Sequence, residues 1–291
     1  MVVFYDPRCL DYGPSTRPEQ PARLRYTVPL LQERHPHWKW EIPPAARDED
    51  LLRAHRASLL ARLKVAEDFD ADSLWFEDIE HHARRATGAA VAMVQSALTT
   101  REPAISLMRP PGHHATTDRA MGFCYLNHIA VAALHALSQP HVNKVAVWDF
   151  DAHHGNGTEA ILVGQEGTLF TSVHQSPGYP GTGLVNLQNC LNWPVAPGTP
   201  RADHMAVLRE SWDRVVAFEP DLVLVSAGFD AYRDDPITDM TLEKQDFATL
   251  GAWLHESHLP TGAVLEGGYS SDLPELVDAF LAAWKGEFVA A

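Results

Sequence analysis

Short runs of apolar residues alternate along this chain with longer stretches in which apolar residues recur at helical spacing. The short runs are residues 104–108, 145–148, 168–173, 222–226 and 262–265, and the helical stretches are about 79–98, 126–137, 203–216 and 242–254, one segment after Gly157 and one from Asp272 to Trp284. Apolar strands that alternate with helices are typical of a parallel sheet covered on both faces. The pattern therefore predicts an α/β fold with a central, mostly parallel sheet and helices on both faces.

Three other segments have recognisable patterns. Leucines within residues 51–63 follow helical spacing, and Asp48 or Asp50 is the expected N-cap of that helix. Segments 175–183 and 232–240 contain clusters of Pro, Gly or Asp residues, so they are interpreted as loops that border the strand ends. Loops in such positions usually determine specificity.

Each of the five apolar runs ends in residues that are suited to chemistry. In chain order, the residues after these runs include His113 and His114, then Asp149 to His153, then His174, Asp230, and finally Glu266 to Tyr269. Ligands of open parallel sheets bind beyond the carboxyl ends of the strands. We therefore expect a single active site at the C-terminal ends of the strands.

Three potential metal ligands stand at alternate positions after the run over 145–148, namely Asp149, Asp151 and His153. In an extended backbone, residues two apart point the same way, and buried charges are usually paired or bound to a cation. The alternative is an Asp–His pair that caps the strand. A catalytic zinc needs about three protein ligands, and Asp151, His153 and Asp230 can supply them. Zn²⁺ is the first choice, with Fe²⁺ or Co²⁺ as alternatives, because these ligands discriminate weakly among such ions.

A metal-activated water needs a partner that takes up its proton and later donates it to the leaving group. The consecutive residues His113 and His114 follow a rigid Pro-Pro-Gly turn and are the candidates for that role. Each needs an acceptor that fixes its tautomer, and Asp149 and Asn156 can serve. The other His pair, at 81–82, is instead assigned to an exposed helix face.

Tyr269 follows two adjacent glycines, which let the backbone approach a neighbour or a ligand closely. A Tyr hydroxyl that faces a metal can donate a hydrogen bond to the oxyanion of a tetrahedral intermediate. By itself Gly-Gly-Tyr is also consistent with an ordinary turn. Its position at the common strand edge favours the catalytic interpretation.

Length and composition limit the class of protein. The 291 residues are 45% hydrophobic, and no linker, repeat or low-complexity tract divides them, so we expect one catalytic domain over residues 1–291. We find no apolar run of the roughly 18 residues that span a membrane and no secretory signal. These features predict a cytoplasmic protein that does not bind membranes.

Cysteine content and charge narrow the picture further. Cys9, Cys124 and Cys190 are odd in number and widely spaced, which argues against a disulfide framework and against a thiolate zinc site. The formal charge of −15 disfavours nucleic acid as a partner. It would suit a cationic substrate, although excess acid is also a common solubility feature.

Together the motifs resemble those of the histone deacetylase family, including its bacterial deacetylase-like and acetylpolyamine amidohydrolase members. The similar segments are Pro18 to Arg23, Arg109-Pro110-Pro111-Gly112-His113-His114, Gly122 to Asn127, Asp149 to Gly157, Ser226 to Asp230, and Leu265-Glu266-Gly267-Gly268-Tyr269. Asn156 and the run 230–236 are more similar to the class II branch. The resemblance implies an arginase-deacetylase fold and hydrolysis of an acetyl-amide in an acetyl-lysine peptide or a small acetylated amine.

The resemblance also implies roles for individual residues. Asp151, His153 and Asp230 would bind the metal, His114 would act as general base and then acid with support from Asn156, and Tyr269 would polarise the acetyl carbonyl. His113, paired with Asp149, would add electrostatic stabilisation. The substrate channel would be formed by Gly122, Phe123, Tyr179, Ile237 and Gly268. A structural K⁺ would be bound by Asp149, Asp151, His153, Ser172 and Val173.

The chain also departs from the family pattern. The segment 175–183 is compact, which bears on the position of Tyr179, and Ile237 stands where a polyamine-selective enzyme would carry a carboxylate. The rim Asp that holds the substrate backbone in the family has two candidates, Asp70 and Asp72. The chain is short for the family, which implies trimmed loops.

Two alternatives to a deacetylase have distinct requirements. An arginase-like ureohydrolase needs carboxylates that bridge two metals, and Gly155 stands where one would be expected. A catalytically weak relative that binds acylated ligands is disfavoured because both His residues, the three ligands and Tyr269 are all present. The motifs do not identify the natural substrate, the acyl chain length or the oligomeric state.

Overall fold

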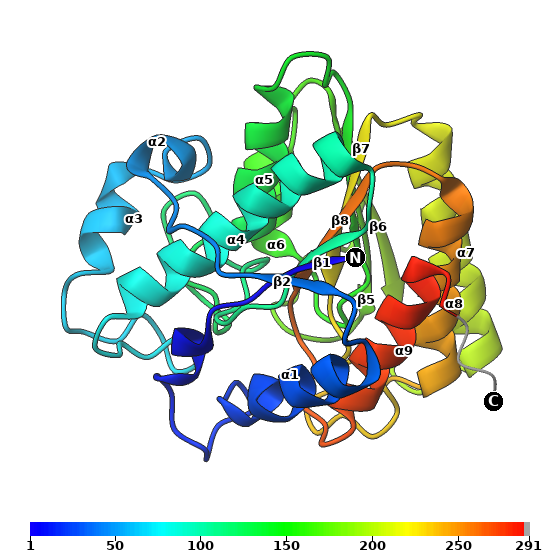
Figure 1. Ribbon diagram of the computed structural model, residues 1–291, viewed down its shortest axis with the longest axis horizontal. Coiled ribbons are helices and arrows are strands. Elements are labelled where there is room, and N and C mark those ends of the chain that lie inside the picture. The colour runs from blue at the N-terminus through cyan, green and yellow to red at the C-terminus, as the bar shows by residue number, and fades with distance from the viewer. Residues whose placement is uncertain (288–291) are drawn as a thin grey trace.

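The strands pair in one sheet that is parallel throughout. The computed structural model describes residues 1–287, and Figure 1 shows the sheet at the centre of the molecule. Its strands are β1 (Val2–Phe4), β2 (Lys39–Glu41), β3 (Ala104–Ser106), β4 (Val145–Asp149), β5 (Thr168–Gln175), β6 (Cys190–Val195), β7 (Leu222–Ala227) and β8 (Thr261–Leu265). They are ordered β2-β1-β3-β8-β7-β4-β5-β6, and every pairing is parallel. The predicted α/β fold is confirmed.

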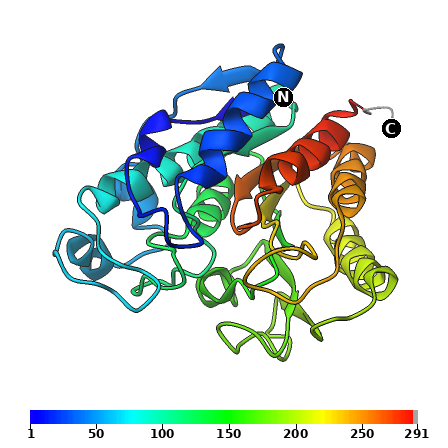
Figure 2. The ribbon, with the colours of Figure 1, turned by 90° about the horizontal axis from the view of Figure 1, so that it is seen from below.

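Helices cover both faces of this sheet. They are α1 (Ala22–Arg34), α2 (Asp48–Leu51), α3 (Ala57–Arg62), α4 (Ile79–Thr100), α5 (His128–Leu137), α6 (Asn156–Leu162), α7 (Arg201–Ala217), α8 (Lys244–Ser257) and α9 (Leu273–Lys285), with a 3₁₀ turn at Pro7–Leu10. Helix α4 contacts β1, β3 and β8, while α5 contacts β4 and β7. Helix α7 contacts β4, β5 and β6, and α1 lies beside α9 in both ribbon views (Figures 1 and 2).

Several elements differ from the sequence-based expectation. The strands β1 and β2 and the helix α1 are not among the predicted elements, because three-residue strands show no period and α1 contains Pro29. The helix expected over residues 51–63 is two short helices, α2 and α3. The N-cap of α2 is Arg47, so the expectation of an Asp48 or Asp50 cap is wrong.

The assignment of both His81 and His82 to an exposed helix face is also wrong for one of them. His81 is exposed, whereas His82 is 4% exposed and packs on the ring of Tyr12 with ring centroids 4.7 Å apart. Burial lowers the pKa of His82 to about 4, with a further contribution from the nearby charge of Arg85. Adjacent helix positions differ by about 100° in direction, so one residue of the pair faces the core.

The core on the α7–α9 face is dominated by aromatic side chains. Trp148 contacts Trp212, with ring centroids 4.8 Å apart, and Phe150 lies 5.5 Å from Phe280. Phe229 in turn lies 5.8 Å from Phe280. Large aromatic side chains supply much of the burial energy of a core. Because Phe150 and Phe229 directly precede Asp151 and Asp230, this packing fixes the backbone where the polar strand ends begin.

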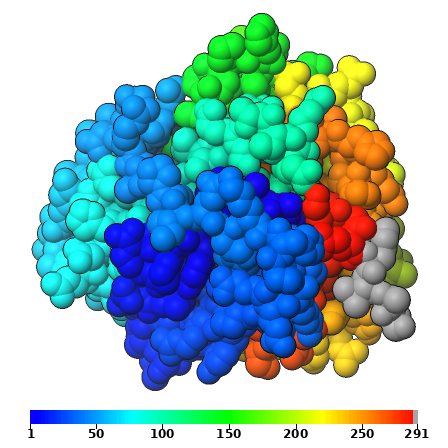
Figure 3. Space-filling view, viewed as in Figure 1, coloured from blue at the N-terminus to red at the C-terminus, as the bar shows by residue number. Residues whose placement is uncertain are grey.

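A buried ion pair ties the N-terminal segment to the loop after β3. Arg109 is fully buried, and it donates to Glu19 through Nε (2.5 Å) and Nη2 (2.7 Å). A bidentate pair of this kind is well defined in geometry. The guanidinium also donates to the carbonyl of Cys9 at 2.7 Å. In Figure 3 the N-terminal residues in blue lie beside the cyan residues of the α3–α4 region.

Two buried histidines predict a loss of stability at mildly acidic pH. His55 accepts a hydrogen bond from the Asn127 N–H on Nε2 (2.8 Å), and His128 is fully buried between Thr87 and Pro110. Burial lowers the pKa of each to about 4. At these two sites the unfolded chain therefore binds more protons than the folded one between about pH 4 and 6.5, so their contribution to the free energy of unfolding falls as pH falls through this range.

We expect each of these histidines to add up to about 1.4 kcal/mol per pH unit to that slope. Urea unfolding at several pH values between 4.5 and 7 measures it. The His55→Gln variant cannot take up the proton and should have a shallower slope. An equal slope in wild type and variant would contradict the assignment.

Candidate metal centre and active site

The predicted site residues gather at the C-terminal ends of the central strands, around a pocket of about 270 Å³. The pocket is lined by Arg17, Pro18, Asp72, His114, Gly122, Phe123, His153, Tyr179, Ile237 and Tyr269. These residues come from eight separate segments of the chain, which the fold brings to one edge of the sheet. Most of the predicted catalytic and channel residues line the pocket directly.

Asp151, His153 and Asp230 form a compact cluster beside this pocket. Each offers one ligand atom, and these atoms all lie within 4.8 Å of one another. His153 Nδ1 lies 3.2 Å from Asp151 Oδ1 and 2.8 Å from Asp230 Oδ2. Both carboxylates are fully buried. Two carboxylates and one imidazole at this spacing match the ligand set of a divalent cation.

The expected geometry at the end of β4 is only partly right. The strand ends at Asp149, and the backbone turns through bends at 151–153, so these residues do not continue in an extended conformation. Asp149 Oδ2 lies 3.0 Å from His113 Nδ1 rather than with the ligand cluster. The alternation argument is therefore wrong that all three side chains point to one place: Asp151 and His153 lie in the cluster, whereas Asp149 faces His113.

Backbone groups hold the two carboxylates of the cluster. The Gly267 N–H donates to Asp151 Oδ2 at 2.7 Å, and the Ala152 N–H donates to Asp230 Oδ1 at 2.8 Å. Such outer contacts orient ligands and tune metal affinity. Burial alone would lower the pKa of His153. The neighbouring carboxylates of Asp230 and Asp151 instead raise it well above its ordinary value.

Gly267 cannot carry a side chain without displacing the ligands. A Cβ at this position would lie 2.3 Å from Asp230 Oδ2 and 2.6 Å from Asp151 Oδ2. We expect Gly267→Ala to weaken metal binding by about 10- to 100-fold, because changes at outer-shell positions have effects of that size. Competition titration with a metal indicator measures the affinity. Unchanged affinity in a folded variant would show that the cluster is not the metal site.

The two consecutive histidines have different partners. His113 contacts Asp149, whereas His114 Nδ1 lies 2.8 Å from Asn156 Oδ1. A carbonyl oxygen accepts, so the Nδ1 of His114 carries the proton and Nε2 is left as the basic nitrogen. His114 lines the pocket and His113 lies behind it, with the two ring centroids 4.1 Å apart.

Electrostatics separate the pKa values of these two histidines. Burial would lower the pKa of His113, but Asp151 and Asp149 raise it to about 10. Burial lowers the pKa of His114 well below its ordinary value, and the charges of His113 and His153 lower it further. The result is a cationic His113 next to a neutral His114. Pairs of groups with pKa values pushed apart in this way are characteristic of acid–base sites.

Tyr269 lines the same pocket as His114 and His153. Its backbone N–H donates to Asp235 Oδ2 at 2.7 Å, and the guanidinium of Arg23 lies 4.8 Å from the centre of its ring. Gly268 adopts φ +112°, a conformation that favours glycine. The ring centroids of Tyr269 and Phe123 are 5.8 Å apart. The Gly-Gly-Tyr turn therefore serves to orient this side chain.

Aromatic rings form the walls of the pocket. The ring of Tyr179 lies 5.0 Å from that of His114 and nearly perpendicular to it, and Phe123 adopts φ +66° with its N–H donated to Ser73 Oγ at 3.1 Å. A Cβ at Gly122 would lie 2.5 Å from the His114 ring and 2.9 Å from Tyr179. Ile237 also lines the pocket. The compact loop over 175–183 therefore does bring Tyr179 to the pocket.

The two remaining predicted residues lie on β5. Ser172 pairs in register with Asp149 of β4, and its hydroxyl lies 3.0 Å from His174 Nδ1. Val173 follows and is buried. Both residues are therefore next to the strand end that carries Asp149.

Two buried carboxylates near the site were not predicted to have a role. Glu266 Oε2 accepts from the N–H groups of Gly112 (2.6 Å) and His113 (3.1 Å), and burial raises its pKa to about 7. Burial and the charge of Asp230 raise the pKa of Asp235 to about 7. Both residues orient catalytic segments rather than face the pocket. Their sequence signal is a carboxylate two residues before a predicted site residue, Gly268 for Glu266 and Ile237 for Asp235.

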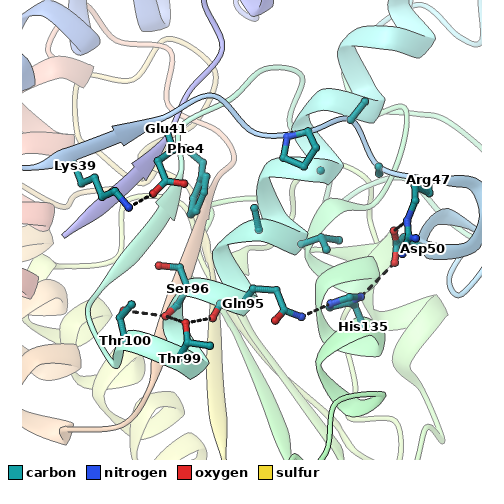
Figure 4. Close-up of a pocket in the computed structure, with 16 residues that line it drawn as sticks. Phe4, Lys39, Glu41, Arg47, Asp50, Gln95, Ser96, Thr99, Thr100 and His135 are labelled. Carbon is teal, nitrogen blue, oxygen red and sulfur yellow. Dashed lines mark hydrogen bonds and ion pairs between the residues drawn. The ribbon is translucent and has the colours of Figure 1, made fainter.

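A larger pocket, of about 580 Å³, lies elsewhere, between β2, α4 and α5 (Figure 4). Its polar groups pair with one another: Asp50 Oδ1 lies 3.2 Å from His135 Nδ1, and Gln95 lies 2.9 Å from His135 Nε2. Lys39 likewise pairs with Glu41. This pocket contains none of the predicted site residues, and the charged groups labelled in Figure 4 are all paired.

Comparison with known proteins places this arrangement in context. Residues 17–284 match the sequence profile of the histone deacetylase domain. A probable deacetylase of Methanothermobacter thermautotrophicus is 33% identical over 94% of this chain and 86% of its own length. A histone deacetylase-like amidohydrolase of Pseudomonas aeruginosa is 38% identical over 78% of this chain and 65% of its own length. The crystal structure of an acetylpolyamine aminohydrolase from Burkholderia pseudomallei superimposes with a TM-score of 0.91 at 25% identity, covering 99% of each chain.

These similarities confirm the family resemblance that the motifs indicated.

The described residues 1–287 contain no helix that is long and apolar enough to cross a bilayer. Cys9, Cys124 and Cys190 are free thiols, and all three are buried.

Proposed function

This chain belongs to the histone deacetylase family, and on that premise we propose that it is a zinc-dependent amidohydrolase that removes an acetyl group from an acetyl-lysine side chain or a similar acetylated amine. The observation that carries the proposal is the convergence on one pocket of the Asp151–His153–Asp230 cluster, the His114–Asn156 pair and Tyr269. Family membership supports the hydrolase class. The choice of zinc as the metal and of the acetylated amine as the substrate goes beyond what family membership alone indicates.

The metal would be held by Asp151, His153 and Asp230. When bound, a divalent ion supplies a Lewis acid that polarises the acyl carbonyl and lowers the pKa of a water molecule. The ligand set fits this role because the two buried carboxylates carry more negative charge than a single imidazolium balances. Fe²⁺ and Co²⁺ are compatible with the same ligands.

We assign proton transfer to His114. Its neutral Nε2 would take a proton from the attacking water and return it to the amine when the C–N bond breaks. Asn156 fixes the tautomer that this step requires. Cationic His113, held by Asp149, would stabilise the negative charge that develops nearby. The Tyr269 hydroxyl would donate to the oxyanion.

The remaining predicted residues would shape the substrate path. Phe123 and Tyr179 would flank the aliphatic stem, with Gly122 and Ile237 beside them and Gly268 in the turn before Tyr269. We further propose that Asp149, Asp151, His153, Ser172 and Val173 hold a structural K⁺. We also infer one catalytic domain over residues 1–291, because its single sheet takes strands from the N-terminal and the C-terminal regions.

The relatives named as acetylpolyamine amidohydrolases favour a small acetylated amine as the alternative substrate. Acetate release from an acetyl-lysine peptide and from N-acetylputrescine, by protein loaded with Zn²⁺ and by chelator-treated protein, tests the proposal. Release that requires metal from either substrate would support it. Bound zinc without release from any acyl amide would overturn it and favour a binding role.

A further inference from the structure

We propose that the preferred substrates are free α,ω-diamino acids acylated on the ω-nitrogen, such as Nε-acetyl-lysine, and that Arg17 and Asp72 recognise their zwitterionic end. This inference rests on the proposed function and names the substrate class of the same site. It begins from two side chains of opposite charge that line the pocket and have no part in the proposed chemistry.

The size of the pocket favours a small molecule. Its volume of about 270 Å³ is at the lower limit of ligand pockets, which are typically about 300–1,000 Å³. The same pocket is lined by His114, His153 and Tyr269 and by Arg17 and Asp72. One small ligand that fills it therefore contacts both the catalytic residues and the charged pair.

The guanidinium of Arg17 is anchored but retains free donors. Its Nη2 donates to the carbonyls of Ala71 (2.7 Å) and Asp72 (3.2 Å), which fixes it against the loop over 70–73. Within residues 1–287, no hydrogen bond involves its Nε or Nη1. The side chain is 25% exposed. An anchored guanidinium whose Nε–H and Nη1–H groups are free can donate a charge-assisted hydrogen bond to a carboxylate.

Asp72 offers the complementary charge. Its carboxylate is 50% exposed and lies 3.5 Å from Arg17 Nη2. Asp70, in contrast, accepts from the N–H groups of Asp72 (3.0 Å) and Ser73 (2.6 Å), so it holds the turn. An exposed ion pair such as Arg17–Asp72 is weak, and the α-carboxylate and α-ammonium of an amino acid can replace it with two pairs of the same kind.

This arrangement discriminates among acylated amines by charge. N-acetylcadaverine is Nε-acetyl-lysine without the α-carboxylate. Its ammonium can pair with Asp72, but it has no carboxylate to pair with Arg17. A capped acetyl-lysine carries neither charge and matches neither side chain. The free amino acid is the one of the three that matches both.

The test compares steady-state acetate release from these three substrates by the metal-loaded protein, with Arg17→Gln and with Arg119→Gln. Arg119 is exposed, and its charge acts on Tyr179, but it does not line the pocket, so it controls for the loss of one positive charge nearby. We expect Arg17→Gln to raise the KM for Nε-acetyl-lysine about tenfold with kcat nearly unchanged, which corresponds to one charged hydrogen-bond interaction. Arg119→Gln should match wild type.

Equal kcat/KM for the free and the capped compounds, or no change in their ratio in Arg17→Gln, would overturn the inference while the deacetylase function stands. If no substrate releases acetate, the proposed function fails, and calorimetric binding of Nε-acetyl-lysine decides the inference separately. Binding that Arg17→Gln weakens would support it. Absence of binding to folded, metal-loaded protein would overturn it.

Discussion

Asp151→Ala is expected to lose metal binding and to reduce acetate release at least about a thousandfold, because the metal contributes several kcal/mol of transition-state stabilisation. The Asp151 side chain contacts His153 Nδ1 at 3.2 Å, an imidazole that Asp230 also contacts, and its other oxygen accepts from the Gly267 N–H. Removal of the Asp151 carboxylate therefore leaves two proposed ligands, His153 and Asp230, and leaves the Gly267 N–H without its acceptor. Metal content after dialysis and acetate release measure the two effects.

Asp213→Ala is the matched control, since Asp213 is an exposed carboxylate on α7 that pairs with Arg209 and lies outside the site. It should retain the wild-type metal content and rate. If Asp151→Ala kept a full equivalent of tightly bound metal, the ligand assignment would be wrong. Near-wild-type activity would contradict it equally.

Tyr269→Phe is expected to retain the metal and to lower kcat by about 10²- to 10³-fold, the usual cost of one oxyanion donor. The ring should stay in place because its position depends on contacts that Phe can also make, namely the Phe123 ring and the Arg23 guanidinium. The backbone N–H bond to Asp235 is unaffected by the substitution. Rates at saturating substrate, together with metal content, separate this effect from loss of the metal.

A parallel measurement distinguishes a chemical role from a binding role. If the hydroxyl acts on the oxyanion, KM changes little while kcat falls. A rise in KM with unchanged kcat would assign Tyr269 to substrate binding. Tyr179→Phe, at the other tyrosine that lines the pocket, should leave kcat within a few-fold of wild type.

The sequence alone was sufficient to predict the strands that carry the site. The runs that became β4, β7 and β8 are buried along their whole length, so they read as continuous apolar segments. Polar residues directly after such runs are conspicuous. For the same reason the sequence singles out Asp151 and Asp230, which the structure brings together with His153.

The supporting contacts could not be predicted because they join segments that are far apart along the chain. Glu19 and Arg109 both lie within recognised motifs, but their pairing is a property of the tertiary structure. The contacts of Glu266 with the backbone of Gly112 and His113 have the same origin. Side-chain direction after a strand end also depends on local bends, which is why Asp149 faces His113 instead of the group formed by Asp151, His153 and Asp230.

The order of strands in the sheet has a consequence for how the protein is made. The strands β3 and β4 follow each other along the chain, but β8 and β7 separate them in the sheet. While the ribosome is still synthesising the chain, its N-terminal part can pair β2-β1-β3 and β4-β5-β6, and nothing yet joins the two groups. The strands that close this gap are among the last to emerge, and they precede Asp230 and Tyr269. A site that includes Asp230 and Tyr269 can therefore be complete only after β7, β8 and the turns that follow them have emerged, and until then the nascent chain exposes two unpaired strand edges.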